Sequence, residues 1–533
     1  MQQESNSGSR AIRVDAALAN KLFKSHNGDT MKFCYQCGVC SSVCPISRYI
    51  GTYRPNRIIE LAKLGIRNRP QSNAFLFCSA CTLCTKGCPQ NVRVHEIMQA
   101  LKDQAIDDAD VKAFLERGFS DVVEALGSEI PFPITYSWIC LRPPSGHAPG
   151  SGDTASGDPD NSPDSAYMEI IKKALEKALK APAAQNSVQD DVAVPQPPAR
   201  PAAPGSGAKR VAIIGSGPAG LTAAWELARA GFAVTVYENQ PVAGGMLRVG
   251  IPGYRLPKDI VETEIEWIRS AGVEILTNVT VNRDMFDYLT GMGEHTGNSE
   301  HTGNGFDAVF IATGMRVSRK LNVTGEDLKG VRPALEFLSE YNTTGKADIG
   351  KNVVVIGGGN VATDSAGAAL RCGAESVKLF YRRDRKKMPA HEWEIEEVLA
   401  EGVELNTSWW PKAFHGDGEK VTSAEFIFCK SVTDKDGKFN PVFDEKKTVS
   451  VDADTVIVAV GQSTDLSFLN DGVDVSRGYI QADPYTLETS LPNVFAGGDA
   501  VSGALGGAAS LVEAIACGKT AAASIIKCIM HNA

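Results

Sequence analysis

Two cysteine-rich runs near the N-terminus constrain this 533-residue chain more than any other feature. Residues 34–45 read CYQCGVCSSVCP and residues 78–89 read CSACTLCTKGCP, so both have the spacing C-x2-C-x2-C-x3-C-P. Runs of this kind hold two four-iron–four-sulfur (4Fe-4S) clusters, and the fourth cysteine of each run ligates the other cluster. The predicted first cysteine set is Cys34, Cys37, Cys40 and Cys88, and the second cysteine set is Cys78, Cys81, Cys84 and Cys44.

Zinc and disulfides are the alternative uses for these cysteines. A structural zinc site needs only four ligands, usually as two separated pairs, whereas each run supplies four cysteines. Disulfides are disfavoured because the first thirty residues contain no apolar stretch of the signal-peptide kind. The other cysteines are scattered and are expected to be inert thiols: Cys140, Cys372, Cys429, Cys517 and Cys528.

Composition narrows the classes of function. The net charge of −9 disfavours a nucleic-acid partner, which would require a basic face. No apolar run reaches the length of a membrane span, so a cytoplasmic protein is predicted. The length suggests roughly three or four domains.

The composition and the apolar pattern of the sequence divide the chain into three parts. Between the cysteine runs, apolar residues follow Pro55 at helical spacing, which predicts a helical scaffold for an N-terminal ferredoxin domain over 1–130. Residues 131–208 are rich in Pro, Gly, Ser and Ala and are predicted to form a flexible linker, with a short helix over 167–181. From residue 209 the chain alternates between strand and helix patterns and repeats one supersecondary unit.

The first copy of this unit has the pattern of a dinucleotide-binding turn. An apolar strand at 211–214 leads into G-x-G-x-x-G at the start of a helix, where backbone N–H groups bind a pyrophosphate. Glu238 ends the next strand, at the position where a carboxylate accepts hydrogen bonds from ribose hydroxyls. The candidate residues of this turn are Gly215, Gly217, Pro218, Ala219, Gly220 and Glu238.

The second copy differs at its ribose position. Gly357 and Gly359 repeat the turn, with Asn360 and Val361 opening the next helix. Where the first copy has an acid, this copy has Tyr381 followed by Arg382 and Arg383. Arginine suits a 2′-phosphate, so NADPH is favoured over NADH. The alternative is that the basic run 382–387 is simply a solvated turn.

Two such units, with IATG at 311–314 and VFAGGDA at 494–500, resemble the two-dinucleotide flavoprotein disulfide-reductase-like superfamily. The resemblance implies that the first unit binds FAD, that an inserted second unit binds NAD(P)H, and that a strand at 456–462 returns the chain to the FAD domain. It also implies FAD-binding roles for further residues: Gly245, Thr313, Gly314, Gly498 and Asp499. The predicted fold is multidomain, an α-helical ferredoxin domain plus Rossmann-like α/β FAD and NAD(P)H domains. The predicted boundaries after the linker are 209–330 (FAD), 331–455 (NAD(P)H) and 456–533 (FAD).

Closer resemblances concern the two halves separately. Residues 244–275 and 381–405 resemble the glutamate synthase small-subunit family, and the likeness covers about 209–533. Residues 31–130 are similar to the C subunit of heterodisulfide reductases, so the chain resembles a fusion of both. The resemblance implies a heteromeric complex whose partner is like the B subunit of heterodisulfide reductases or another multi-cluster enzyme.

These observations predict an electron-transfer subunit of an anaerobic redox complex. Electrons would pass between NAD(P)H and a partner protein via FAD and the two 4Fe-4S clusters, with cofactors rather than side chains carrying the chemistry. The second unit has no C-x-x-C, so a dithiol relay of the thioredoxin-reductase type is not expected. The alternatives are a glutamate synthase small-subunit-type accessory, and a non-catalytic nucleotide-binding module for redox sensing or assembly. Flavin-based bifurcation would need two divergent electron paths, of which one is visible.

Overall fold

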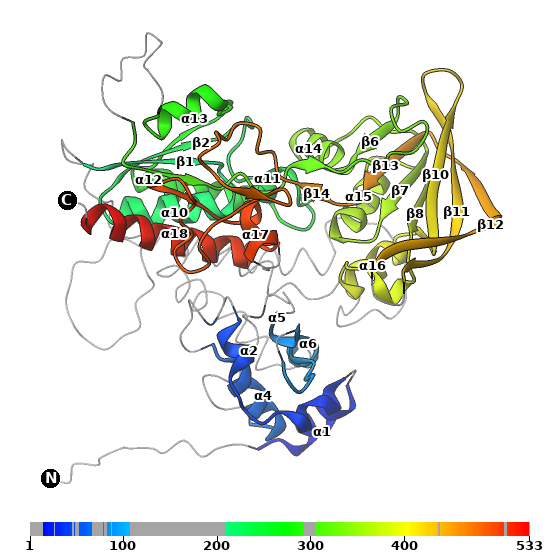
Figure 1. Cartoon of the computed structure of the whole chain (residues 1–533). Helices are drawn as coiled ribbons and strands as arrows, with labels where there is room; N and C mark the ends of the chain where they lie inside the picture. The colour runs from blue at the N-terminus through cyan, green and yellow to red at the C-terminus, as the bar shows by residue number, and fades with distance from the viewer. Residues whose placement is uncertain are drawn as a thin grey trace. The chain divides into compact units, whose positions relative to one another are not determined.

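The computed structural model describes most of the chain outside the predicted linker (Figure 1). The described residues are 14–25, 27–44, 47, 53–66, 78, 83–86, 88–106, 208–292, 305–434, 438–505 and 509–531. They fall into two compact units, one holding the N-terminal residues and the other holding most of 208–531. Nearly all of the predicted linker, the predicted helix over 167–181, Cys81 and Cys140 lie outside the described residues. The predicted boundary between 455 and 456 falls inside one strand (Thr455–Ala459) and is wrong, and the other finer domain boundaries stay predictions.

The N-terminal unit is helical in its described part, as its sequence predicts. Its helices are α1 (Ala16–Lys24), η1 (Gly28–Phe33), α2 (Val39–Ser42), α4 (Pro55–Lys63), α5 (Leu83–Lys86) and α6 (Val94–Ile106). Asp15 begins α1 by accepting a 2.9 Å hydrogen bond from the Leu18 N–H, and Pro55 occupies the first turn of α4, where no N–H partner is needed. The apolar side of α4 is buried, so the helix predicted after Pro55 is confirmed.

The larger unit contains a first five-stranded parallel sheet in the order β17-β4-β1-β2-β3. Its strands are β1 (Arg210–Ile214), β2 (Ala233–Tyr237), β3 (Glu274–Leu276), β4 (Ala308–Ile311) and β17 (Val494–Ala496). The helices of this part of the chain are α10 (Pro218–Arg229), α11 (Met246–Val249), α12 (Lys258–Ser270), α13 (Arg283–Leu289), α17 (Asp499–Leu505) and α18 (Leu511–His531). All strands of the second sheet lie in the sequence between β4 and β17, so the second sheet is an insertion within the sequence of the first.

The second sheet is also parallel and five-stranded, in the order β6-β13-β7-β8-β9. Its strands are β6 (Val331–Pro333), β7 (Asn352–Gly357), β8 (Ser376–Tyr381), β9 (Glu404–Thr407) and β13 (Thr455–Ala459). The helices α14 (Ala334–Thr344), α15 (Asn360–Arg371) and α16 (Glu392–Ala400) and the short 3-10 helix η4 (Arg385–Lys387) belong to it.

One strand assignment from the sequence is wrong. Residues 456–462 were expected to return the chain to the FAD domain, but β13 pairs with β6 and β7 in the second sheet. The strand that returns to the first sheet is β17. Buried parallel strands are all continuous apolar runs, so the run itself does not say which sheet it joins.

A three-stranded antiparallel sheet of β10 (Trp409–Gly416), β11 (Val421–Thr433) and β12 (Phe439–Asp452) lies in the sequence between β9 and β13. It was not predicted. It packs on the second sheet through Phe380 and Phe426, whose stacked rings are 3.8 Å apart. Two short pairings complete the strands: β5 (Val317–Ser318) with β14 (Gln462–Ser463), and β15 (Val475–Ser476) with β16 (Tyr479–Ile480). Within the described residues, none of the helices combines the length and the apolar character needed to cross a membrane.

The glycines of the first turn have separable roles. A Cβ atom on Gly220 would lie 2.0 Å from the Gly215 carbonyl oxygen, so α10 approaches β1 too closely for any side chain there. A Cβ on Gly217 would meet no heavy atom within 4 Å. Gly220 is therefore required by packing, whereas Gly217 borders open space.

We expect Gly220→Ala to destabilise the flavin-free protein by about 1 to 3 kcal/mol through overpacking. Gly217→Ala, the matched control, should leave the unfolding transition nearly unchanged. Thermal unfolding followed by circular dichroism measures both. An unchanged midpoint for Gly220→Ala would contradict the close packing of α10 on β1.

Candidate functional site

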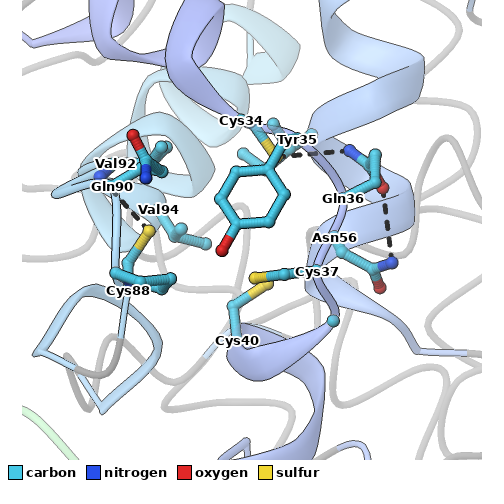
Figure 2. Close-up of a pocket in the computed structure, with 13 residues that line it drawn as sticks. Cys34, Tyr35, Gln36, Cys37, Cys40, Asn56, Cys88, Gln90, Val92 and Val94 are labelled. Atoms are coloured by element: carbon cyan, nitrogen blue, oxygen red, sulfur yellow. Dashed lines mark hydrogen bonds between the residues drawn. The ribbon is translucent and has the colours of Figure 1, made fainter.

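The structure places the first cysteine set around one pocket (Figure 2). Cys34 follows η1 directly, Gly38 in the left-handed conformation turns the chain into α2, and this brings Cys40 to the same place. Cys88 arrives from beyond α5, as the fourth cysteine of the other run. The pocket is therefore lined by three cysteines of the first run and the fourth cysteine of the second run, as the spacing predicts.

Two of the sulfurs around this pocket accept hydrogen bonds from N–H donors. Gln36 Nε2 donates to Cys34 Sγ over 3.3 Å, and the Val92 N–H donates to Cys88 Sγ over 3.3 Å. Burial, followed by the neighbouring Cys34, raises the pKa of the Cys40 thiol to about 11. Four thiols that crowd one another in this way fit a positively charged iron–sulfur core, whose thiolates such N–H donors would tune.

The described residues give no support to the zinc alternative. Among the described residues, no three His, Cys, Asp or Glu side chains converge closely enough to hold a single metal ion. A polynuclear cluster spaces its ligands more widely than one ion does, so the donor set suits the cluster.

The described members of the second cysteine set gather around Tyr53. Cys44, Cys78 and Cys84 are buried, and Tyr53 is only 1% exposed. Burial and the three thiols raise the pKa of Tyr53 well above its usual value, and its hydroxyl is hydrogen-bonded to Cys78. Cys81 lies outside the described residues. Tyr53 was missed by the sequence interpretation because nothing in the cysteine spacing points to it.

The first glycine turn leaves backbone open at the N-terminus of α10. Gly217 caps the helix, Pro218 begins it, and Ala219 and Gly220 follow. Gly245 lies against this turn, where an added Cβ would come within 2.8 Å of the Gly217 Cα. A helix N-terminus that only glycine backbone borders is a site for a pyrophosphate.

Glu238 lies beside this turn, at the end of β2. Its Oε2 accepts hydrogen bonds from the Ser216 N–H (3.0 Å) and the Ser216 hydroxyl (2.5 Å), and its Oε1 accepts from the Gln240 N–H (2.8 Å). Ser216 Oγ also accepts from the Gly244 N–H at 3.1 Å. Ser216 therefore holds both the Glu238 carboxylate and the 244–245 segment in place. The sequence did not predict this role, because Ser216 is the x of G-x-G, where any residue is allowed.

Two polar side chains near the ends of β4 and β17 have no hydrogen-bond or ion-pair partner among the described residues. Thr313 Oγ1 is buried without a hydrogen-bond partner, next to Gly314. Asp499 follows Gly498 at the start of α17, and burial alone raises the pKa of its carboxyl to about 6. Buried polar atoms are normally satisfied, so these groups fit a ligand rich in hydroxyls such as FAD.

The second glycine turn has the same construction. Gly359 caps α15, and Asn360 opens the helix with its Nδ2 donating to Glu394 Oε1 over 3.1 Å. Val361 follows on the helix. Gly357 ends β7, so strand, turn and helix N-terminus succeed one another as in the first copy.

The basic run after β8 is not uniform. Arg385 forms ion pairs with Glu392 and Glu396, and Lys387 pairs with Asp384. In the part of the chain that the structure describes, Arg382 and Arg383 have no carboxylate within ion-pair distance. Burial and the neighbouring Arg383 lower the pKa of Arg382. Two cations without a counter-charge therefore lie at the ribose position of the second turn.

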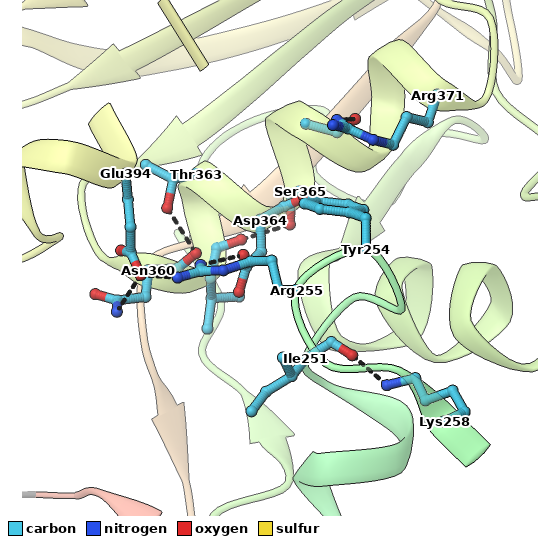
Figure 3. A network of polar contacts seen from close by, with 12 residues as sticks. Ile251, Tyr254, Arg255, Lys258, Asn360, Thr363, Asp364, Ser365, Arg371 and Glu394 are labelled. Atoms are coloured by element: carbon cyan, nitrogen blue, oxygen red, sulfur yellow. Dashed lines mark hydrogen bonds and ion pairs between the residues drawn. The ribbon is translucent and has the colours of Figure 1, made fainter. Parts of the chain in front are cut away.

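A buried ion network joins the two nucleotide-binding parts of the larger unit (Figure 3). Arg255, between α11 and α12, forms a 2.5 Å ion pair with Asp364 of α15 and a second ion pair with Glu394 of α16. The Tyr254 hydroxyl donates to the Asp364 carbonyl oxygen over 3.3 Å, and the guanidinium of Arg371 lies 3.8 Å from the Tyr254 ring centre. Sequence reasoning missed this network, because no local pattern links residues more than a hundred positions apart.

Two parallel sheets with a glycine turn each, together with a cysteine-bearing helical unit, define an iron–sulfur protein of the two-dinucleotide oxidoreductase class. The chain belongs to the pyridine nucleotide-disulphide oxidoreductase family, whose family model matches residues 209–518. A second model, for a 4Fe-4S dicluster domain, matches residues 30–92. The first match implies FAD and a pyridine nucleotide and the second implies two 4Fe-4S clusters, so the predicted fold class and cofactors are confirmed.

Three relatives are similar over different parts of the chain. The NADP(+)-dependent formate dehydrogenase subunit beta of Moorella thermoacetica is 45% identical over 323 residues, which are 60% of this chain and 43% of that one. The NADPH-Fe(3+) oxidoreductase subunit beta of Geobacter sulfurreducens is 30% identical over 502 residues, 88% of this chain and 67% of that one. A putative glutamate synthase [NADPH] small chain of Cereibacter sphaeroides is 40% identical over 331 residues, which are 59% of this chain and 76% of that one. The predicted resemblance to glutamate synthase small chains is confirmed, and the chain spans less than half of the Moorella relative.

Asp499 gives the stability of the flavin-free protein a pH dependence of defined sign. Its folded pKa of about 6 lies above the unfolded value near 3.9, so its stabilising contribution is full below about pH 4 and is lost as the pH rises through 6. Asp499→Asn should therefore be more stable than the parent at pH 7.5 by about 2 to 3 kcal/mol. The difference should vanish near pH 4, as measured by denaturant unfolding at both pH values.

Asp454 provides a control of opposite sign. The backbone N–H of Asn352 lowers the pKa of its carboxyl, so Asp454→Asn should lose stability at pH 7.5. If Asp499→Asn were also less stable at pH 7.5, the assignment of a desolvated carboxyl to half-buried Asp499, which has no ion-pair partner among the described residues, would be contradicted.

Proposed function

We propose that this chain is an electron-transfer subunit that moves electrons between NADPH and a partner protein through FAD and two 4Fe-4S clusters. The observation that carries the proposal is the presence of two glycine turns in one unit and of a gathered cysteine set in the other. The names of two relatives support it, since both are subunits that use NADP(+) or NADPH. The cytoplasmic location stays a prediction.

In this proposal the first turn holds FAD. The pyrophosphate binds at Gly215, Gly217 and the start of α10, and Glu238 accepts from the ribose. Asp499 would meet the ribityl or pyrophosphate region of FAD, and Thr313 would lie at the FAD crossover, where bound FAD would satisfy the buried Thr313 Oγ1. The residues proposed to bind FAD are Gly215, Gly217, Pro218, Ala219, Gly220, Glu238, Gly245, Thr313, Gly314, Gly498 and Asp499. FAD, when bound, links the two-electron chemistry of the nicotinamide to one-electron carriers.

The second turn binds the nucleotide substrate. Gly357 and Gly359 leave the N-terminus of α15 to the pyrophosphate, with Asn360 and Val361 beside it. Arg382 and Arg383, which have no carboxylate partner among the described residues, favour a 2′-phosphate over the solvated-turn alternative, and therefore NADPH over NADH.

The first and second cysteine sets hold one 4Fe-4S cluster each, and they differ in exposure. Cys37 is exposed and Cys34 and Cys88 are partly so, whereas the described members of the second set are all buried. Electron exchange between proteins needs a carrier near the surface, so we assign the first set to the exchange with the partner.

The partner should present an acidic surface. Residues 30–92 contain eight lysines and arginines and a single acid, Glu60, while the whole chain carries −9. Such a basic domain steers an acidic protein towards it. A multi-cluster enzyme like the B subunit of heterodisulfide reductases is one partner of this kind.

A glutamate synthase small-chain role is the second candidate. It is favoured by the 40% identity over 331 residues to a putative small chain. That similarity covers 59% of this chain, and a glutamate synthase large subunit in complex with it would decide for this candidate.

Anaerobic titration of the reconstituted protein tests the proposed function. We expect NADPH to change the flavin absorbance and to generate cluster electron paramagnetic resonance signals, with NADH much less effective. Reduction of the flavin alone would indicate that electrons run from the partner towards NADP+. A flavin unchanged by either nucleotide would favour the non-catalytic binding module.

Cysteine substitution tests the ligand assignment. Cys37→Ser should lower the bound iron from about eight to about four atoms per chain, because each cluster holds four irons. Cys372→Ser, in the second sheet's domain, is the control and should keep all of the iron. Bound FAD should be the same in both variants. Full iron occupancy in Cys37→Ser would contradict the assignment.

A further inference from the structure

The side chain of Arg382 rests on two aromatic rings of the three-stranded sheet. Its guanidinium carbon lies 5.1 Å from the ring centre of Trp410 in β10 and 5.5 Å from that of Phe439 in β12. The two rings are 6.0 Å apart and tilted at 45°. Phe443 also contacts Trp410, edge to face, with ring centres 5.6 Å apart.

This aromatic pair, Trp410 and Phe439, is not part of the core. Phe439 is 61% exposed, an unfavourable position for a large apolar ring unless it has another use. The preceding Trp409 points to the opposite face of β10, where it packs with Phe428 and the core of the second sheet. The two neighbouring tryptophans therefore have different surroundings on one strand.

A cation–π contact of an arginine leaves its in-plane N–H groups available for hydrogen bonds. A guanidinium offers its flat face to aromatic rings and its in-plane N–H groups to phosphate oxygens, so the two contacts do not compete. Arg383 is engaged differently, since its Nη1 donates to Tyr381 Oη over 3.5 Å. Arg382 has an oriented guanidinium and no carboxylate partner among the described residues.

We propose that Trp410 and Phe439 are positioning residues that hold Arg382 for the 2′-phosphate of NADPH. The selectivity of the second turn for a phosphorylated nucleotide then depends on the antiparallel sheet inserted between β9 and β13. The inference rests on the proposed NADPH site. It adds that the specificity is set by two rings that do not touch the nucleotide's pyrophosphate turn.

Binding of NADP+ and NAD+ to the FAD-loaded full-length protein, measured by calorimetry, tests the inference. Arg382→Met should weaken NADP+ strongly and leave NAD+ nearly unchanged. Trp410→Ala and Phe439→Ala should each weaken NADP+ by about three- to fivefold, the loss of one cation–π contact, again with little effect on NAD+. Trp410→Phe should restore most of the NADP+ affinity, because it keeps an aromatic face.

Trp409→Phe is the matched control on the opposite face and should leave the ratio of the two affinities unchanged. If Trp410→Ala does not fold, Phe439→Ala decides alone, because that ring is largely exposed. An unchanged ratio in Phe439→Ala, or equal weakening of NADP+ and NAD+, overturns the inference. The readout does not involve electron transfer, so the inference can fail while NADPH still reduces the flavin, and it can hold while no partner accepts electrons.

Discussion

The arrangement of the two nucleotide turns depends on the buried ion pairs of Arg255 with Asp364 and Glu394. Each charge has been removed from water, and each is compensated only when the segment between α11 and α12 meets α15 and α16. Losing one partner would leave an uncompensated buried charge, which is far more costly than losing a surface pair. The network therefore favours one relative placement of the two sheets. The proposed hydride transfer needs such a placement, because reacting atoms must be held about 3 to 3.5 Å apart in a defined orientation.

The other notable polar groups are those that the described chain does not compensate. Among the described residues, Thr313 Oγ1 is buried without a partner, Arg382 and Arg383 lack a carboxylate, and burial raises the pKa of the Cys40 thiol in the first cysteine pocket. Buried polar groups are normally satisfied, so a ligand at these places would complete them. Each one lies where a different ligand chemistry fits: hydroxyls, a phosphate, and an iron–sulfur core.

The sequence predicted what is determined locally. Cysteine spacing and the two glycine patterns act through neighbouring residues, so the turns, the helix after Pro55 and the strands before each turn were predictable. Ser216, Tyr53 and Arg255 were missed because their roles come from tertiary contacts with residues remote in the chain. The strand at 456–462 was assigned to the wrong sheet for a related reason, since an apolar run specifies burial and not its neighbours. The ligand assignments themselves stay predictions until the cofactors are measured.

Charge distribution and exposure together explain how one chain can serve a partner. Residues 30–92 carry a net charge of +7 in a chain of −9, which leaves −16 for the remainder. Attraction over such distances is screened beyond about 8 Å at physiological salt, so it accelerates encounter without defining the bound state. The geometry of the bound complex has to come from short-range contacts. Phe33 (51% exposed) and Tyr35 (59% exposed) are the sequence neighbours of Cys34. Exposed aromatic rings beside an accessible cysteine are suited to a protein contact that brings two carriers close. Because the second cysteine set is buried in its described part, a partner that docked on these rings would exchange electrons with the first set before the second.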